Sequence, residues 1–309
     1  MQHRYNTYSN YLKSLFGTRV QKLPIAAGFT CPNRDGTLSV GGCTFCDNTA
    51  FNPSYCSSEK SIQQQIEEGI AFHQKRNRQA ERYLAYFQAF SNTYKSHEEL
   101  KQIYQQALDM PGIAGIVIGT RPDCIDAPLL HYINEIQKKH FVMLEYGVES
   151  VYDETLKRVN RGHDFATAER AIHMTAEHGI PCGAHLIFGL PGETKAMMLK
   201  ASDVISQLPL TTVKFHQLQI FKGTKMAEEY QQHPEAFHLF NLEEYIDFVI
   251  DFVERLSPSI VIERFAGEVP PRYLVSEPWR KLRYDEVLSR IEKRMEERDT
   301  WQGKLKIES

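Results

Sequence analysis

The stretch Gly28–Asn48, GFTCPNRDGTLSVGGCTFCDN, contains three of the six cysteines of the chain. Cys43 and Cys46 are separated by two residues, a spacing that lets two thiolates reach one metal centre. Cys31 follows a predicted strand at Leu23–Ala27, and the Pro, Gly, Asn and Asp residues after it predict a loop. Three thiolates can hold three irons of a cubane cluster and leave the fourth iron open to a small molecule. The stretch therefore predicts a metal centre on a loop.

A zinc knuckle is the alternative at these cysteines, with Cys56 or a histidine as the fourth ligand. The protein would then be a non-catalytic zinc-binding module on an α/β scaffold. Colour separates the two hypotheses, because an anaerobically purified iron–sulfur protein is brown and a zinc protein is colourless.

Composition indicates an ordinary globular protein. The chain has 309 residues, 42% hydrophobic and 24% charged, enough for one large α/β domain or two modest ones. Its net charge of −3 gives no global sign of a nucleic-acid partner. It contains no apolar run long enough for a membrane span and no apolar signal-peptide core, so we expect a cytoplasmic location without a membrane partner. Disulfides are rare there, and we therefore predict three free thiols, Cys56, Cys124 and Cys182.

Beyond the cysteine loop, short apolar runs alternate with longer amphipathic segments. The apolar runs predict strands at 23–27, 83–89, 113–118, 141–146, 181–188 and 212–220. The amphipathic segments predict helices at 61–79, 96–108, 127–139, 151–159, 164–178 and 194–207. Such alternation favours a parallel sheet with covering helices, and ligands of such folds bind at the carboxyl ends of the strands.

The pattern changes after residue 222. A helix is predicted at 241–256, one more strand at 260–262, an irregular segment at 264–278 and a charged amphipathic helix at 284–299. We expect residues 1–222 to form the core with an N-terminal extension. Residues 223–309 are expected to be an extension packed on that core, because no linker precedes them.

The first 34 residues are basic and contain no acidic residue. Tyrosines are interleaved among the cations, a composition that suits stacking on nucleic acid. A docking helix with snorkelling cations has the same composition, and it is the interpretation we favour. The cations are Arg4, Lys13, Arg19, Lys22 and Arg34.

The cysteine loop resembles that of the radical S-adenosylmethionine (SAM) superfamily, in which an aromatic residue, here Phe45, precedes the last cysteine. The spacing here is C-x11-C-x2-C, whereas C-x3-C-x2-C is usual in the superfamily. The resemblance implies an α/β fold, a partial (β/α)6 barrel with N- and C-terminal extensions. It also implies two cofactors, SAM and a [4Fe-4S] cluster on Cys31, Cys43 and Cys46.

Later segments resemble the strand ends that contact SAM in this superfamily: QAFSNT at 88–93, GTRPD at 119–123, LEYGVES at 144–150, NRGH at 160–163 and HLIFGLPGET at 185–194. The resemblance implies that Arg161 binds the SAM carboxylate, that Glu149 contacts SAM and that His185 reaches its ribose. It further implies that Phe45, Ser91, Asn92, Thr120 and Gly189 contact the cofactor.

Structural roles are the alternatives for these residues. Glu149 and Arg161 would pair with each other, Arg121 would pair with Asp123, and His185 would be a core residue. On the sixth predicted strand, alternation points Lys214 and His216 to one face, which makes them candidate catalytic residues.

As a whole, the sequence is similar to the YhcC/YtqA family of the Elongator-like radical SAM group, whose Bacillus-type members are also called MnmL. The resemblance implies conversion of 5-carboxymethylaminomethyl-uridine to 5-aminomethyl-uridine at the tRNA wobble position. One electron from the cluster would cleave SAM, and the resulting radical would abstract a hydrogen from the substrate. The rival within this class is a radical enzyme with a small, porphyrinogen-like substrate.

The implied partners are the tRNA anticodon loop, a reductant such as flavodoxin or ferredoxin, and a methyltransferase that acts on the product. The basic N-terminus and the segment from residue 264 to 283 are candidates to hold the tRNA. In that segment the charged or stacking residues are Arg264, Arg272, Tyr273, Trp279, Arg280, Lys281 and Arg283.

Overall fold

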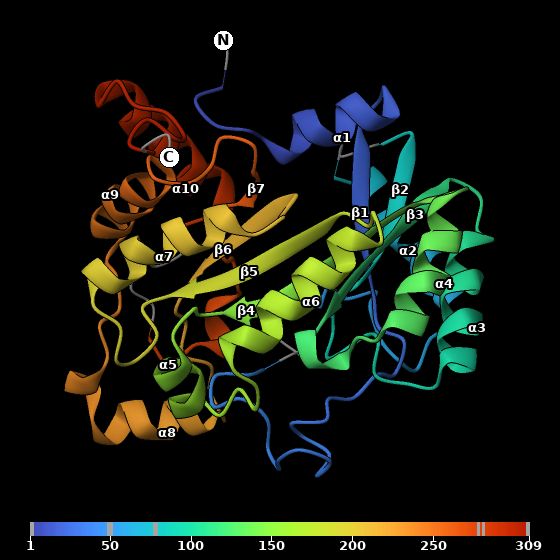
Figure 1. Ribbon diagram of the computed structural model, residues 1–309, viewed down its shortest axis with the longest axis horizontal. Helices are drawn as coiled ribbons and strands as arrows, with labels where there is room; N and C mark the ends of the chain where they lie inside the picture. Colours follow the sequence, from blue (N-terminus) through green and yellow to red (C-terminus); the bar gives the residue numbers. More distant parts are fainter. Residues whose placement is uncertain (1–2, 48–51, 77–79, 277–278, 280–281, 307–309) are drawn as a thin grey trace.

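Seven parallel strands form one sheet in the order β1 to β7 in the computed structural model, which describes residues 3–47, 52–76, 80–276, 279 and 282–306. The sheet is curled, and helices cover its outer face (Figure 1). This is the partial-barrel α/β fold expected from the sequence, with the additional strand after residue 222 as its seventh member. The strands are β1 Val20–Ile25, β2 Arg82–Phe87, β3 Ile113–Thr120, β4 Phe141–Glu149, β5 Cys182–Phe188, β6 Thr212–Gln217 and β7 Val261–Arg264.

The helices between the strands pack on the sheet through a core of buried aliphatic and aromatic side chains. Polar caps begin most of them; for example, the side chains of Ser61 and Asn241 accept hydrogen bonds from backbone N–H groups of α2 and α9. The helices are α2 Ile62–Gln74, α3 His97–Leu108, α4 Ala127–Gln137, α5 Asp153–Arg158, α6 Phe165–Glu177, α7 Lys195–Gln207, α8 Lys225–Gln232, α9 Leu242–Val253 and α10 Tyr284–Glu297.

Helix α2, strand β6 and helix α8 are among the elements that differ from the sequence-based expectation. Helix α2 ends at Gln74, and its predicted last turn falls partly on residues 77–79, outside the described part of the chain. Strand β6 ends at Gln217 rather than at residue 220. Helix α8 was not predicted; Thr224 caps it and its apolar residues pack against Phe45.

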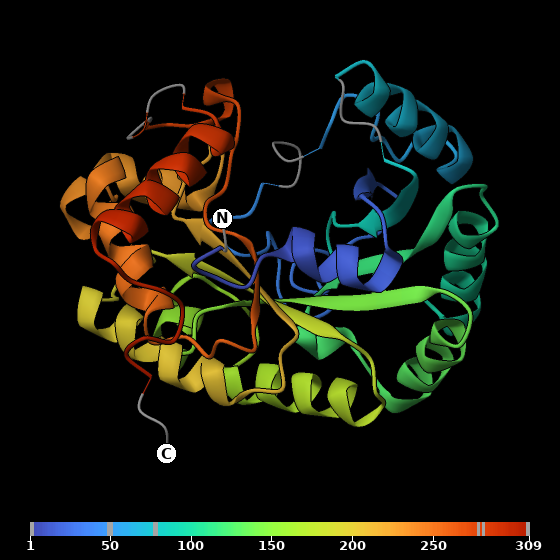
Figure 2. The same cartoon turned by 90° about the horizontal axis from the view of Figure 1, so that it is seen from above.

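Helix α1, Tyr8–Phe16, docks on the sheet (Figure 2). The residue before it, Thr7, forms a parallel bridge with Ile262 of β7, and the Ile262 amide donates to the Asn6 carbonyl at 2.8 Å. Because α1 leads into β1, it lies at the amino ends of the strands, opposite the loop that follows β1 (Figure 1). For the basic N-terminus, the structure therefore agrees with the interpretation favoured from the sequence, a helix that docks on the rest of the protein.

The C-terminal part shares both the sheet and the core. Strand β7 pairs with β6, and α9 packs its phenylalanines on those of β5 and β6. Cys56, Cys124 and Cys182 are free thiols, as expected. Within the described ranges, no helix combines the length and the apolar character needed to cross a bilayer.

Candidate active site

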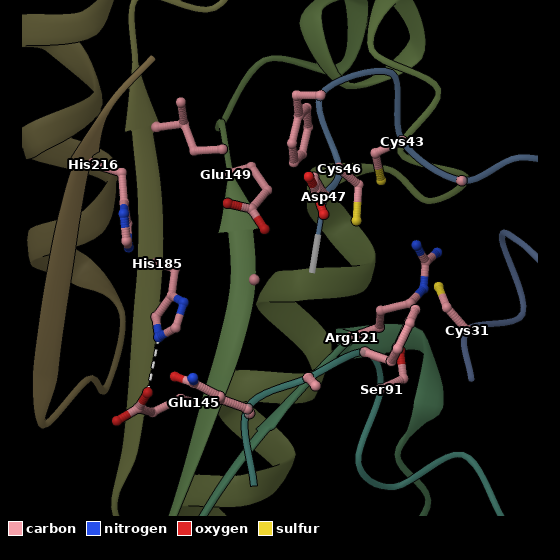
Figure 3. Close-up of a pocket in the computed structure, with 18 of the residues that line it drawn as sticks. Cys31, Cys43, Cys46, Asp47, Ser91, Arg121, Glu145, Glu149, His185 and His216 are labelled. Carbon is pink, nitrogen blue, oxygen red and sulfur yellow. Dashed lines mark hydrogen bonds and ion pairs between the residues drawn. The ribbon is translucent and has the colours of Figure 1, made fainter. Parts of the chain in front are cut away.

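A cavity of about 250 Å³ lies at the carboxyl ends of the strands, between them and the cysteine loop (Figure 3). Eleven of the thirteen site residues predicted from the sequence line it: Cys31, Cys43, Phe45, Cys46, Ser91, Thr120, Glu149, Arg161, His185, Lys214 and His216. The other two, Asn92 and Gly189, lie outside its lining. The Asn92 amide donates to the Gly119 carbonyl at 2.8 Å, so this side chain braces the end of β3.

The cysteine loop is anchored to the turn between α5 and α6. The Asn33 amide donates to the Asn160 carbonyl at 2.5 Å, and the Thr44 amide donates to the Val159 carbonyl at 3.0 Å. Within the loop, the Cys46 amide donates to the Cys43 carbonyl at 3.0 Å, which keeps the C-x-x-C pair in a tight turn. This irregular loop is therefore held by hydrogen bonds from the Asn33 side chain and from backbone N–H groups to backbone carbonyls.

The three thiols face the cavity with donors and cations around them. Cys43 Sγ lies 3.6 Å from both Asn33 Nδ2 and Arg161 Nη1. Burial, followed by the neighbouring Cys43, raises the pKa of Cys46 to about 11. A bound metal would lower that pKa, because the thiolate is the ligand.

The zinc alternative is not favoured by this geometry. Cys56 packs with Tyr55 and Ala26 in a separate apolar cluster and does not line the cavity. Among the described residues, no three His, Cys, Asp or Glu side chains form a group that could hold a single metal ion. A cubane cluster instead takes each cysteine at a different iron, so its ligands need not converge on one point.

Arg161 and Glu149 converge over Gly147. Arg161 Nη2 donates to the Gly147 carbonyl at 2.5 Å and lies 3.7 Å from Glu149 Oε1. Arg161 and Glu149 therefore form the ion pair that was the structural alternative for these two residues. A Cβ on Gly147 would lie 2.5 Å from Glu149 Oε1 and 2.7 Å from Arg161 Nη2. Any larger residue at position 147 would therefore displace these two side chains. A bulge here puts Glu149 at φ 68°, a strained conformation for a non-glycine residue.

Arg161 keeps one donor without a partner. Its side chain is buried, and its Nε has no hydrogen-bond partner among the described residues. Although burial favours the neutral guanidine, Cys43 and Glu149 raise the pKa of Arg161 above its ordinary value. A permanent cation with an unused donor beside the thiols is suited to hold an anionic ligand group.

Thr120 is the last residue of β3 and Arg121 follows it, and the polar side chains of both already have partners. Arg121 forms a fork on Asp123, Nε to Oδ1 at 2.8 Å and Nη2 to Oδ2 at 2.7 Å, and also donates to the Arg161 carbonyl. This confirms the structural alternative of an Arg121–Asp123 pair. Thr120 Oγ1 lies 2.6 Å from Thr93 Oγ1.

A buried ionic network forms the floor of the cavity. Glu145 Oε1 accepts from Lys22 at 2.5 Å, and Glu145 Oε2 lies 3.0 Å from the ammonium of Lys214. Tyr86 donates to the same carboxylate at 2.7 Å, and Glu263 pairs with both lysines at 2.7 and 2.8 Å. Two carboxylates and two ammonium groups therefore compensate one another inside the barrel.

The two histidines at the cavity stand above this network. His185 Nε2 lies 2.9 Å from Glu145 Oε2 (Figure 3), so this carboxylate orients its ring. The ring centroids of His185 and His216 are 5.9 Å apart. Burial, then His185 and Arg264, lower the pKa of His216 well below its ordinary value, which keeps its imidazole neutral at pH 7.

Comparison with known proteins agrees with this geometry. The family model described as the radical SAM superfamily matches residues 31–205, and one described as a radical SAM C-terminal domain matches residues 210–297. The chain belongs to the radical SAM superfamily. It is 32% identical over 309 residues to the uncharacterized protein YtqA of Bacillus subtilis, covering 98% of this chain and 93% of YtqA. The predicted resemblance to the YhcC/YtqA family is thereby confirmed.

More distant similarities lie in the Elongator-like group. A tRNA uridine(34) acetyltransferase of Methanocaldococcus infernus is 28% identical over 186 residues, covering 59% of this chain and 33% of that protein. The solved structure of M. infernus Elp3 with an N-terminal deletion superposes with a TM-score of 0.69 at 18% identity. It covers 92% of this chain and 64% of that one, and it confirms the fold.

Membership of this superfamily identifies the cofactors as SAM and a [4Fe-4S] cluster, as expected. The residues present fit both groups. Three thiols line one cavity, which suits a cluster with three protein ligands. Arg161 Nη1 lies 3.6 Å from Cys43 Sγ, and its buried Nε has no hydrogen-bond partner among the described residues, so this donor is available to an anionic group of the cofactor.

Sequence reasoning assigned no role to several residues of this radical SAM site. Asn33, whose amide reaches Cys43, was seen only as part of the loop, and Glu145 only as part of a motif. A usable signal existed for Glu145, since a carboxylate inside an apolar strand requires a buried partner. Lys22 was counted with the surface cations, but its side chain is only 12% exposed.

Proposed function

We propose that this radical SAM enzyme modifies tRNA, converting 5-carboxymethylaminomethyl-uridine at the wobble position to 5-aminomethyl-uridine. One observation carries the proposal: the cavity that contains the three cysteines and Arg161 shares Cys46 with a second hollow, which the exposed Lys222 of a basic rim borders. The similarity to a tRNA uridine(34) acetyltransferase supports a uridine at the same tRNA position as substrate.

The basic rim consists of Lys222, Lys225 and Arg272, all exposed and none engaged in an ion pair with a described residue. Lys222 borders a second hollow together with Cys46 of the cysteine loop, and its ammonium donates to the Arg272 carbonyl at 3.0 Å. Free cations around a cavity mouth attract a phosphate backbone in a salt-dependent way. Local binding of this kind is compatible with the net charge of −3.

The basic N-terminus, one of the two predicted candidates for holding the tRNA, is left out of this proposal apart from Arg34, which lines the cavity. Helix α1 lies at the amino ends of the strands, and two of its neighbouring cations are already paired, Lys22 with Glu145 and Arg4 with Asp299. In the other candidate segment, Trp279 is used for packing: its ring contacts that of Tyr245 in a tilted arrangement, with centroids 4.9 Å apart, and its indole N–H donates to the Phe240 carbonyl. Arg280 and Lys281 lie outside the described residues.

Within this proposal, Cys31, Cys43 and Cys46 hold the cluster and Arg161 holds the SAM carboxylate. Glu149 and His185 line the ribose, and Phe45, Ser91 and Thr120 complete the SAM pocket. Asn92 and Gly189 act indirectly, by shaping the ends of β3 and β5. When bound, the cluster and SAM supply the radical chemistry that removes a hydrogen from the substrate.

The protein's own groups position the substrate. A wobble base has to leave its stack to enter the cavity, where the side chains of β6 stand opposite the cysteine loop. Lys214 is held by Glu145 and Glu263, so of the two catalytic candidates His216 is the one free to contact the substrate. The proposed hydrogen donor is the substrate carbon between the nitrogen and the carboxylate.

The remaining parts of the proposal concern the cellular setting. The reaction would take place in the cytoplasm, with flavodoxin or ferredoxin as the electron donor. A methyltransferase would then act on the aminomethyl product.

Nucleoside analysis tests the proposal. Transfer RNA from a strain that lacks this gene is digested, and its wobble uridines are quantified against the parent and a complemented strain. We expect 5-carboxymethylaminomethyl-uridine to accumulate and the aminomethyl product to disappear. An unchanged profile, in an organism that makes the aminomethyl product, would refute the proposal and favour a small-molecule substrate.

A further inference from the structure

Five arginine or lysine side chains line the described part of the cavity, and four of them already have acceptors. Each of the four is held by groups of the protein itself. They are Arg34 on the Cys46 carbonyl, Arg121 on Asp123, Arg161 on Gly147 and Glu149, and Lys214 on Glu145 and Glu263.

Arg264, the fifth cation, forms no hydrogen bond or ion pair with any described residue. Its guanidinium stands 5.7 Å from the ring centroid of Tyr284. The backbone next to it is clamped: the Phe265 amide donates to Tyr284 Oη at 3.2 Å, and Tyr245 donates to the Phe265 carbonyl at 2.5 Å. Arg264 is therefore fixed at its base, while its charged end is available to a ligand.

The charges around Arg264 do not neutralise it. The network below contains two lysines and two glutamates, which compensate one another, so Arg264 adds an excess positive charge to the cavity. His216, on the neighbouring strand, has no hydrogen bond to a described residue. A Cβ on Gly267 would lie 3.0 Å from His216 Nδ1, so a glycine at this position leaves room for the ring.

We infer that Arg264 binds the carboxylate of the substrate's carboxymethylamino group, with His216 as a neighbouring hydrogen-bond donor. A guanidinium matches a carboxylate with two parallel N–H donors. This inference rests on the proposed function, and it names the residue that recognises the part of the substrate to be removed.

Two other anionic groups, the SAM carboxylate and the tRNA phosphates, are also expected near the cavity, and other cations are placed to bind them. Arg161, beside Cys43, is the cation placed to take the SAM carboxylate. The tRNA phosphates have the exposed rim of Lys222, Lys225 and Arg272. Arg264 is half-buried at the end of β7 and lines the cavity itself, not its rim. We expect the modified base to reach this position and the tRNA backbone phosphates to stay outside the cavity.

Two nucleosides without phosphate test the inference: 5-carboxymethylaminomethyl-uridine and 5-aminomethyl-uridine. Their binding to the anaerobically reconstituted protein with SAM is measured by ligand-observed NMR up to millimolar concentration. We expect the wild type to bind the carboxylate-bearing nucleoside about 30-fold more tightly or better, the ratio typical of a buried charge pair. Arg264→Gln should abolish this preference, Arg264→Lys should keep part of it, and the rim variant Arg272→Gln should keep it whole.

SAM affinity of the same variants separates the two carboxylates. It should be unchanged in Arg264→Gln and reduced in Arg161→Ala. The inference is overturned if the wild type shows no preference for the carboxylate, if Arg264→Gln keeps it, or if Arg264→Gln weakens SAM binding instead. A wild type that prefers the carboxylate but leaves the modified tRNA unconverted supports the inference and refutes the proposed reaction.

Discussion

Lys22 of β1 and Glu263 of β7 form an ion pair, with 2.7 Å between Nζ and Oε2. These are the two edge strands of the curled sheet, so the pair connects its opposite edges through the barrel interior. Glu145, on the central strand β4, binds the same ammonium at 2.5 Å. The first and last strands are therefore tied to the middle of the sheet directly below the cavity.

Replacing Lys22 tests this connection. Lys22→Met leaves two buried carboxylates with Lys214 as their shared ammonium partner, and we expect a loss of about 3–5 kcal/mol in the free energy of unfolding. Urea denaturation of the two proteins measures it. Lys13→Met, on the exposed side of α1, should change stability by less than about 0.5 kcal/mol. Equal effects of the two substitutions on the free energy of unfolding would show that the ion pairs of Lys22 do not stabilise the protein.

Glu145 should make stability depend on acid. Burial alone would raise its pKa, but Lys214, Lys22 and His185 hold the pKa well below its ordinary value. In the unfolded chain this carboxylate takes up its proton at a pH of about 4.3, above the pH at which the folded protein does so. Its contribution is therefore present above that pH and is lost as the pH falls through the folded pKa.

Denaturation between pH 3 and pH 6 measures this slope. Below a pH of about 4.3 the free energy of unfolding should fall less steeply in Glu145→Gln than in the wild type. Glu154→Gln, at an exposed glutamate that forms no ion pair with a described residue, should keep the wild-type slope. A Glu145→Gln protein with the full wild-type slope would contradict the assigned pKa direction.

The three cysteines of the loop should be required for iron. Changing Cys31, Cys43 and Cys46 to alanine should abolish iron and sulfide incorporation during anaerobic reconstitution, because no other described cysteine lines the cavity. Cys182→Ala, which alters a thiol buried in β5 near the Pro209 carbonyl, should incorporate iron like the wild type. Wild-type iron and sulfide in the triple variant would refute the assignment.

Gly162 should be required for the cysteine loop because it leaves room for the Asn33 side chain, and not only because of its left-handed backbone conformation. It has φ 80°, and a Cβ there would lie 2.6 Å from Asn33 Oδ1, displacing the amide that reaches Cys43. Gly179 has φ 69° with nothing within 4 Å of its Cβ position, so it is a matched control. Both alanine variants should lose about 1–2 kcal/mol from left-handed backbone strain. Only Gly162→Ala should also lose iron incorporation; equal iron content in both would contradict the anchoring role of Asn33.

Local pattern was sufficient for the elements of this fold and for its cysteine ligand candidates. Apolar runs and helical periodicity predicted all seven strands within a few residues, and Ser61 and Asn241 were recognisable as caps because capping depends on the next three residues. The C-x-x-C pair was visible for the same reason. Thr224, which caps the unpredicted helix α8, carried a similar signal but had only a short, polar helix after it.

The sequence by itself determined the order of strands and helices, the cysteine loop and the family, because these depend on residues close in the chain. Only the tertiary structure decided which charged side chains form ion pairs. Lys22 looks like one cation of a basic N-terminus, yet its partners Glu145 and Glu263 lie 123 and 241 positions away. Arg264 looks like one cation of an irregular segment, and only the curled sheet shows that it lines the cavity without an ion pair to a described residue. Whether a charge is paired depends on distance in space, and only the folded sheet sets that distance.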